Sequence, residues 1–296
     1  MIIGYFKPSI LIYFKPYLEL MFAFTMLGIG AVLNFEDFLP VFKKPHLVLL
    51  GTLTQFGIMP AAGFIIAKSL NFPPQLTLGL ILTGSVPGAM ASNVISYLAR
   101  ADVAYSIALT STSTLLSPIL TPTFTYIFAH TIIEIKFWPM FFSIIKMVII
   151  PLFIGLILKN MFKNAIFKFQ EIFPAFSTIF IAFICGLIVA LNKNYILGIS
   201  LLLFTGILLH NFVGLVGGYA AGTLYRFDIR RRRTLSIEVG MQNAGLGAVL
   251  ALKHFSEKVA LPSALFATWC VITASILAEI WSLSYKNNKY NNFKES

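Results

Sequence analysis

The chain has 296 residues, of which 58% are hydrophobic and 11% are charged, and its formal net charge is +11. A soluble domain of this length needs far less apolar surface, so the composition excludes an ordinary soluble protein and predicts an all-α integral membrane protein. Most lysines and arginines fall in short loops between apolar runs, a pattern that indicates membrane topology and argues against nucleic acid as a partner.

At about 20 residues per span the chain has room for nine or ten membrane helices, and the apolar runs predict nine. Residues 1–14 are expected to form an interfacial stub, without a cleavable signal peptide. The predicted spans are 17–34, 47–70, 75–98, a hydroxyl-rich span that follows Asp102, 137–159, 172–191, 195–224, 234–252 and 259–285. No long polar segment remains, so residues 1–296 are expected to form a single membrane unit.

The third and eighth spans are both interrupted by residues that weaken a helix. The third carries the sequence GSVPGAMASN at residues 84–93, and the eighth carries GMQNAGLG at residues 240–247. Proline removes a backbone hydrogen bond and glycine lowers the cost of unwinding, so both helices are predicted to be broken within the membrane. The two interruptions resemble each other and enter from opposite sides, which predicts an inverted repeat with halves at about 17–131 and 137–285.

The basic residues are divided unevenly between the two sides of this predicted bundle. The richer side holds Lys43, Lys44, Arg100, Lys159, Lys163, Lys168, Arg226, Arg230, Arg231, Arg232, Arg233, Lys286, Lys289 and Lys294. The poorer side holds Lys7, Lys15, Lys136, Lys193, Lys253 and Lys258. Because cytoplasmic loops are rich in Lys and Arg, we expect a multi-pass protein of the inner (plasma) membrane with its N-terminus outside and its C-terminus in the cytoplasm.

Glu238 stands in the interrupted eighth span, close to Gln242 and Asn243. A carboxylate in the hydrocarbon core costs about 2.5 to 3.5 kcal/mol on insertion scales, so its presence there indicates a function. Carboxylate, amide and freed carbonyl oxygens are hard ligands, which suit an alkali or alkaline-earth cation. The sequence therefore predicts an ion site at this break.

Several alternatives stay open at this level. Glu238 is either an ion ligand, a protonated buried carboxyl, or one half of a pair with a distant base such as Lys146. Gln55 is either an ion ligand or part of an inter-helix hydrogen bond, and His210 is either a proton relay or a packing contact. Glycines at positions 214, 217, 218 and 222 predict close packing between helices.

Four stretches of the sequence together resemble the bile acid:sodium symporter family. They are SNVISYLAR at residues 92–100, SIALTSTSTLLSP at 106–118, LHN at 209–211 and EVGMQN at 238–243. The resemblance covers about residues 17–284. It implies a panel domain and a core domain, with two broken helices that cross in the core. Bacterial relatives have ten helices, and the resemblance implies that this chain lacks the first of them.

The resemblance also implies two sodium sites that share one carboxylate. The first site would use Ser92, Asn93, Ser106, Thr110 and Glu238. The second would use Gln55, Glu238, Gln242 and the backbone carbonyls of Val239 and Met241.

The substrate that the resemblance implies is an organic anion bound beside the crossing point. By position, its contacts would be Met90, Ala91, Ser92, Asn93, Asn243, Cys270 and Val271. The sequence departs from the bacterial pattern in this pocket: relatives commonly have Thr in place of Met90 and His-Asn in place of Cys270-Val271. The pocket is therefore expected to be less polar than theirs.

These features favour a secondary active transporter that couples sodium to the uptake of a bile acid-like or small carboxylate anion by alternating access. The alternative is a proton-coupled or uncoupled organic anion carrier on the same scaffold. An enzyme is not expected, because no nucleophile motif stands beside a base. The implied partners are the anion, sodium (two ions) and the lipid bilayer, with no protein partner.

Overall fold

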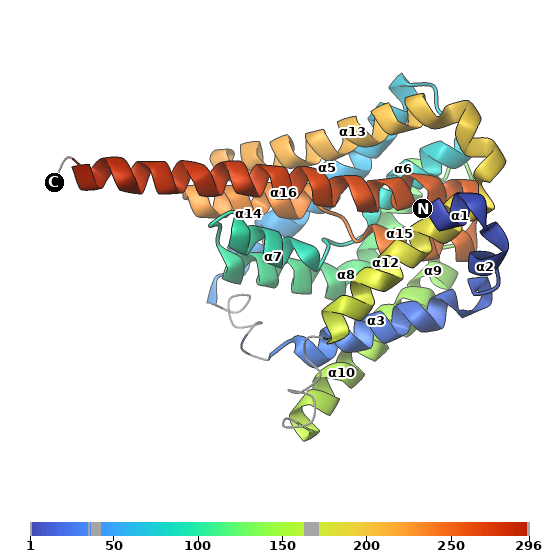
Figure 1. Cartoon of the computed structure of the whole chain (residues 1–296), viewed down its shortest axis with the longest axis horizontal. Coiled ribbons are helices and arrows are strands. Elements are labelled where there is room, and N and C mark those ends of the chain that lie inside the picture. Colours follow the sequence, from blue (N-terminus) through green and yellow to red (C-terminus); the bar gives the residue numbers. More distant parts are fainter. Residues whose placement is uncertain (1, 35, 37–42, 163–171, 295–296) are drawn as a thin grey trace.

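The computed structural model describes residues 2–34, 36, 43–162 and 172–294, and within these ranges the chain forms helices and no strand. Lys163 and Lys168 lie outside the described residues, as do the side chains of Lys286, Lys289 and Lys294. In chain order (Figure 1) the elements are α1 (Ile2–Phe6), α2 (Pro8–Ile12), η1 (Lys15–Tyr17), α3 (Leu18–Val32), α5 (Pro45–Ser69), α6 (Pro74–Ser85), α7 (Ala91–Leu98), α8 (Val103–Ala129), α9 (Phe137–Ile144), the π-helix η3 (Ile145–Ile149), α10 (Ile150–Met161), α12 (Ile172–Leu191), α13 (Lys193–Leu224), α14 (Ile229–Gly240), α15 (Ala244–His254) and α16 (Glu257–Lys294).

Six stretches of the described chain are long and apolar enough to cross a membrane, and they correspond to six of the predicted spans. The other three predicted spans correspond to α12, to the interrupted pair α6 and α7, and to the interrupted pair α14 and α15. Each helix of the two interrupted pairs has fewer residues than any of the six long stretches. The first of these stretches, Pro8–Val32, includes α2, η1 and α3, and its long helix α3 begins at Leu18, one residue after the predicted start of the span. The residues before it form the short helices α1, α2 and η1, of which α2 packs against α12, and their place at the membrane interface stays a prediction.

Both predicted helix breaks are confirmed, and the two breaks contact each other. α6 ends at Ser85 and α7 begins at Ala91, while α14 ends at Gly240 and α15 begins at Ala244. The Ala89 amide donates to the carbonyl of Met241 at 3.0 Å, and the Asn243 amide donates to the carbonyl of Pro87 at 2.8 Å. This short antiparallel bridge satisfies backbone groups that the breaks would otherwise leave unpaired in an apolar interior.

A second set of contacts joins the C-terminal end of α7 to the N-terminal end of α14. Arg230 donates to the carbonyl of Ala101 and Arg233 donates to the carbonyl of Ala99, both at 3.2 Å. Cationic side chains at the end of a helix stabilise its unpaired carbonyls and offset the negative end of its dipole. The two broken helices are thus fastened together at this end as well as at their breaks.

Glycines let α13 pack directly against the backbone of α14, as the sequence predicted. A Cβ atom added to Gly218 would lie 2.5 Å from the carbonyl oxygen of Leu235, and one added to Gly214 would lie 2.9 Å from that of Val239. No side chain fits at these distances, so glycine is required for this close approach.

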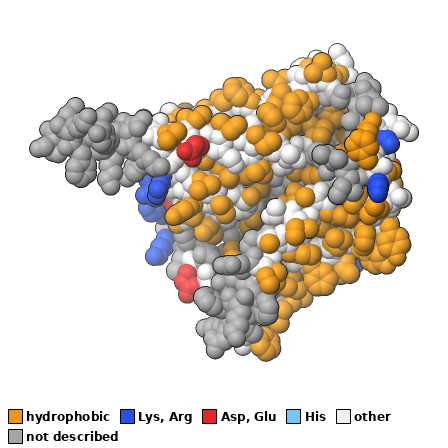
Figure 2. All heavy atoms as spheres, in the orientation of Figure 1, with side chains coloured by type: hydrophobic (Ala, Val, Ile, Leu, Met, Phe, Trp, Pro, Cys, Tyr) orange, Lys and Arg blue, Asp and Glu red, His pale blue; other side chains and the backbone are white. Residues whose placement is uncertain are grey.

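The helices fall into two groups in space. α3, α10 and α12 lie together along one side of the molecule (Figure 1), and α3 packs against both of the others. We call these the α3 group, and we call α5 to α8 with α13 to α16 the crossing group. The outer surface between the ends is largely apolar on the face seen in Figure 2, where the described charged side chains lie toward the ends. Such a surface suits contact with lipid.

The close contact between α13 and α14 gives a test of this packing. Gly218→Ala should reduce the free energy of unfolding by about 1–3 kcal/mol, because its methyl group overpacks against the Leu235 carbonyl. Gly57→Ala is the control, since a Cβ atom there meets nothing within 4 Å. The thermal midpoints of both variants in detergent check this, and equal midpoints would contradict it.

Candidate functional site

The site is built around the carboxylate of Glu238, which lies near the end of α14 and is only 1% exposed. Three hydroxyl groups donate to it: Ser92 from α7, and Ser106 and Thr110 from α8. Thr110 Oγ1 lies 2.9 Å from Glu238 Oε2. Among the described residues, no lysine or arginine forms a hydrogen bond or an ion pair with this carboxylate.

Asn93 adds a further oxygen to this cluster. Its Oδ1 atom lies 2.9 Å from the Ser106 hydroxyl and 3.4 Å from the Thr110 hydroxyl. The structure therefore brings together all members of the first predicted sodium site, Ser92, Asn93, Ser106, Thr110 and Glu238.

The cluster has more oxygen acceptors than hydroxyl protons. The Ser106 proton can serve either Asn93 or Glu238, and the Thr110 proton has a choice between the same two residues. A surplus of carboxylate, amide and hydroxyl oxygens in a buried site is the donor set that a hard cation requires. These residues therefore fit sodium.

A second group of polar side chains lies on the other side of the Glu238 carboxylate. Gln55 Nε2, on α5, is 3.4 Å from Gln242 Oε1 and 3.5 Å from the carbonyl oxygen of Val86. Gln242 Nε2 donates to the carbonyl of Val239 at 2.8 Å. The two carbonyls of the second predicted site, those of Val239 and Met241, each accept one hydrogen bond, from Gln242 and from the Ala89 amide, and each keeps a second lone pair.

Gly88 separates Gln55 from Glu238, a role that the sequence did not reveal. A Cβ atom added to Gly88 would lie 2.8 Å from Glu238 Oε2 and 3.7 Å from both amide atoms of Gln55. Its amide lies 3.4 Å from the Ser113 hydroxyl. The missing side chain therefore leaves room between a carboxylate and an amide.

Asn211 holds the break of α14 in position. Its Nδ2 atom donates to the carbonyl of Gly240 at 2.9 Å, and its Oδ1 atom accepts from Thr273 of α16 at 2.7 Å. The neighbouring His210 donates through Nε2 to the carbonyl of Met59 at 2.9 Å and lies against the ring of Phe266. Its Nδ1 atom is buried without a hydrogen-bond partner among the described residues, so both interpretations of His210 stay predictions.

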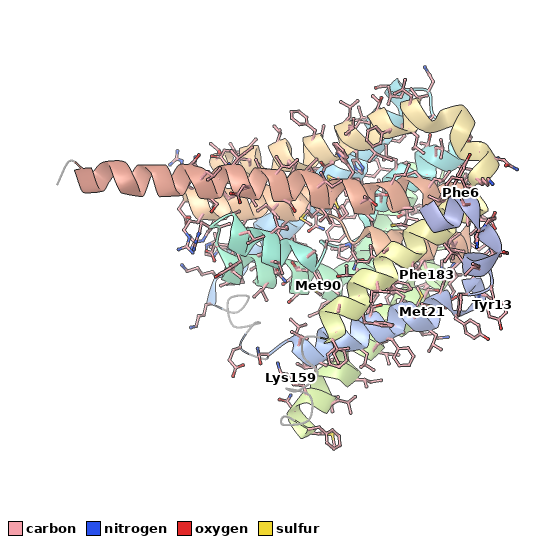
Figure 3. The ribbon with its side chains drawn as sticks, in the orientation of Figure 1. Phe6, Tyr13, Met21, Met90, Lys159 and Phe183 are labelled. Atoms are coloured by element: carbon pink, nitrogen blue, oxygen red, sulfur yellow. The ribbon has the colours of Figure 1, made fainter. Side chains whose placement is uncertain are left out.

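A cavity of about 420 Å³ lies beside the crossing point, between the crossing group and the α3 group. Of the residues predicted to contact the substrate, those that line it are Met90, Ala91, Asn93, Asn243, Cys270 and Val271. Met90, labelled in Figure 3, stands at the N-terminal end of α7. Ser92 is not on the wall, because its hydroxyl is directed to Glu238.

The opposite wall of the cavity comes from α3 and α12 and was missed by sequence reasoning. It includes Phe22, Thr25 and Met26 from α3, and Phe173 and Ser177 from α12. The hydroxyls of Thr25 and Ser177 donate to carbonyls of their own helices. Such residues look the same in a sequence as side chains that face lipid. Among the described lining residues none carries a charge, so the cavity is a mainly apolar chamber.

The crossing point supplies the polarity of this chamber. Asn93 and Asn243 face it from the two broken helices, and Asn243 also caps α15 by accepting from the Leu246 amide at 3.1 Å. The N-terminal ends of α7 and α15 reach the chamber through Ala91 and Ala244. Two positive helix ends and two amides at one side of an apolar cavity favour a ligand with a negative end and an apolar body.

Comparison with known proteins shows the family of this chain. The model of the family described as "Sodium Bile acid symporter family" matches residues 19–199. An "Uncharacterized sodium-dependent transporter YocS" of Bacillus subtilis (strain 168) is 36% identical, over 97% of this chain and 90% of the relative. A "Probable sodium/metabolite cotransporter BASS1, chloroplastic" of Arabidopsis thaliana is 33% identical, over 96% of this chain and 71% of the relative. A "Probable sodium/metabolite cotransporter BASS2, chloroplastic" of Oryza sativa subsp. japonica is 31% identical, over 99% of this chain and 71% of the relative.

The family and these relatives are transporters and not enzymes. With its helices, its oxygen-rich cluster at two joined breaks and the cavity beside them, this chain belongs to the sodium bile acid symporter family.

Proposed function

We propose that this protein is a secondary active transporter that moves an organic anion together with two sodium ions. The observation that carries the proposal is the cluster at Glu238, where hydroxyl, amide and carboxylate oxygens outnumber the protons between them. The names of the relatives, a sodium-dependent transporter and sodium/metabolite cotransporters, support sodium as the coupling ion.

Each ion has its own set of ligands, and Glu238 belongs to both. The first ion is held by Ser92, Asn93, Ser106 and Thr110 with Glu238. The second lies in the space beside Gly88, with Gln55, Gln242 and the carbonyls of Val239 and Met241. Two monovalent cations beside one carboxylate offset the cost of burying its charge.

The anion binds in the cavity with its charged end toward the crossing point. Its contacts there are Met90, Ala91, Asn93, Asn243, Cys270 and Val271, and the helix ends attract its negative charge. The apolar walls favour an anion with an apolar body, such as a bile acid-like molecule or a carboxylate with a hydrocarbon chain.

The architecture that we propose has nine spans in an inverted repeat, with halves at about 17–131 and 137–285. The α3 group forms the panel and the crossing group forms the core. The unequal distribution of basic residues supports an N-terminus outside and a C-terminus in the cytoplasm of the plasma membrane. Residues 1–296 act as one transport unit.

Transport then proceeds by alternating access, with the α3 group rocking against the crossing group. Two ion pairs join the groups beside the start of α3: Lys15 with Glu257 at 2.6 Å, and Glu19 with Lys253. The cavity wall on α3 lies further along the same helix, from Phe22 to Leu33. The ion pairs therefore close one end of the interface while the cavity lies toward the other. Sodium that favours one arrangement raises the affinity for the anion in it, by linkage.

Proton coupling at Glu238 is the alternative, because a buried carboxyl that accepts three hydroxyl hydrogen bonds can also bind a proton. Sodium dependence separates the two functions.

Thermal stability in sodium against potassium, at equal ionic strength, tests the ion site. Wild-type protein should gain about 2.7 kcal/mol when sodium is present at about a hundred times its dissociation constant. Glu238→Ala and Glu238→Gln should lose this gain. A sodium effect that persists in Glu238→Ala would refute the site, and a wild type that responds to pH but not to sodium would favour proton coupling.

Gly88→Ala tests the second ion. Its methyl group would lie 2.8 Å from Glu238 Oε2, in the space assigned to that cation. We expect the sodium titration to weaken at least tenfold, about 1.4 kcal/mol, and to lose cooperativity while one ion still binds. Gly57→Ala is the matched control on α5. An unchanged titration in Gly88→Ala would show that the space holds no ion.

Removing both ion pairs tests alternating access. The double variant Glu19→Gln with Glu257→Gln should shift the equilibrium between the two access states toward the state that is open at the end of the ion pairs. The expected shift is up to about fivefold per pair, because partly exposed ion pairs contribute little stability. The measurement is the rate at which an impermeant maleimide labels Met90→Cys from outside, with the unsubstituted protein reporting any labelling of Cys270. Glu134→Gln with Glu279→Gln removes two carboxylates elsewhere, and an equal rate in both double variants would contradict the mechanism.

A further inference from the structure

A second pocket, of about 190 Å³, lies at the start of α5 and is separate from the transport cavity. One wall is formed by Lys43, Lys44, Leu47 and Val48. The other is formed by the beginning of α8, with Asp102 and Tyr105, and by Arg231 of α14. Neither the proposed ion sites nor the proposed substrate contacts include any of these residues.

The positively charged side chains that line this pocket outnumber the negatively charged ones. Arg231 is already paired, through Nε with Asp102 at 3.2 Å and through Nη1 with Asp228 at 2.9 Å. Lys43 and Lys44 are exposed, and the ammonium group of neither makes an ion pair or a hydrogen bond with another described residue. Among the described residues, the pocket therefore offers two unpaired ammonium groups to an anion.

The backbone around the pocket is held in place. The Tyr105 hydroxyl donates to the carbonyl of Leu47 at 2.9 Å, and the Tyr105 amide donates to Asp102 Oδ1 at 3.1 Å. The first of these bonds joins the first turn of α5 to the first turn of α8, and the second caps α8. The two lysines directly precede α5, which begins at Pro45, at the rim of this recess.

The surroundings of the pocket indicate where its anion comes from. Leu49 and Leu53, on consecutive turns of α5, are each 57% exposed, and both belong to a helix that is long and apolar enough to cross the membrane. A cationic recess at the end of such helices lies at the height of lipid headgroups, with apolar surface beside it for the acyl chains.

We propose that this pocket binds the phosphate headgroup of an anionic membrane lipid, with Lys43 and Lys44 as its ligands. Ammonium groups form charge-assisted hydrogen bonds with phosphate oxygens, and Leu47, Val48 and Ala104 contact the glycerol end of the lipid. Arg231 offsets part of the Asp102 charge, and Lys43 and Lys44 outnumber this one carboxylate in the lining of the pocket.

The test compares the wild type with Lys43→Gln/Lys44→Gln in nanodiscs of phosphatidylcholine, with and without phosphatidylglycerol. Native mass spectrometry counts the retained lipids, and thermal midpoints report their effect on stability. The double variant should bind phosphatidylglycerol about thirty-fold more weakly, about fivefold for each lysine. Lys136→Gln/Lys193→Gln removes the same charge from two lysines outside this pocket and should bind like the wild type.

Equal retention of phosphatidylglycerol by the two double variants would overturn the proposal. A third arm adds inorganic phosphate to the phosphatidylcholine nanodiscs. If phosphate alone raises the thermal midpoint as much as phosphatidylglycerol does, the pocket binds a soluble anion and the lipid assignment is wrong. Equal midpoints of all three proteins in pure phosphatidylcholine show that the substitutions leave the fold intact, so that a lost response reflects lost binding.

Discussion

The structure depends on one buried carboxylate. Glu238 has no lysine or arginine partner among the described residues, and it is surrounded by hydroxyl groups from two other helices. A charge in this position is stable only if something neutral or positive compensates for it. The hydroxyls of Ser92, Ser106 and Thr110 supply part of that compensation, and in the proposed function a sodium ion supplies the rest. α7, α8 and α14 therefore meet at a carboxylate whose charge no described lysine or arginine neutralises.

The breaks in the two helices follow from the same constraint. An unbroken membrane helix hides its backbone groups, whereas a broken one exposes carbonyls and amides close to the ion ligands. The bridge between Ala89 and Met241 uses some of these groups, and Asn211 uses the carbonyl of Gly240. Contacts from α13 and α16 thus keep the opened backbone in a single geometry, which binding of a small ion requires.

Much of this arrangement could be predicted because its signals are local. Pro87 and the nearby glycines predict the first break, and a carboxylate such as Glu238 in an apolar run is conspicuous in any sequence. The α3 and α12 wall of the cavity could not be predicted, because Thr25 and Ser177 satisfy their hydroxyls within their own helices. Gly88 was noted as a helix breaker, yet its position between Gln55 and Glu238 becomes visible only when α5 is placed against the breaks.

The two walls of the cavity have different roles in the proposed mechanism. Every residue assigned to an ion lies in the crossing group, whereas α3 and α12 supply the facing wall without contributing any of those ligands. In the proposed mechanism, residues of that wall can therefore be substituted without changing the sodium ligands. A protein built in this way can acquire a new cargo through changes in two helices, and a designer who wishes to redirect it should begin with Phe22, Met26 and Phe173 and leave the crossing point untouched.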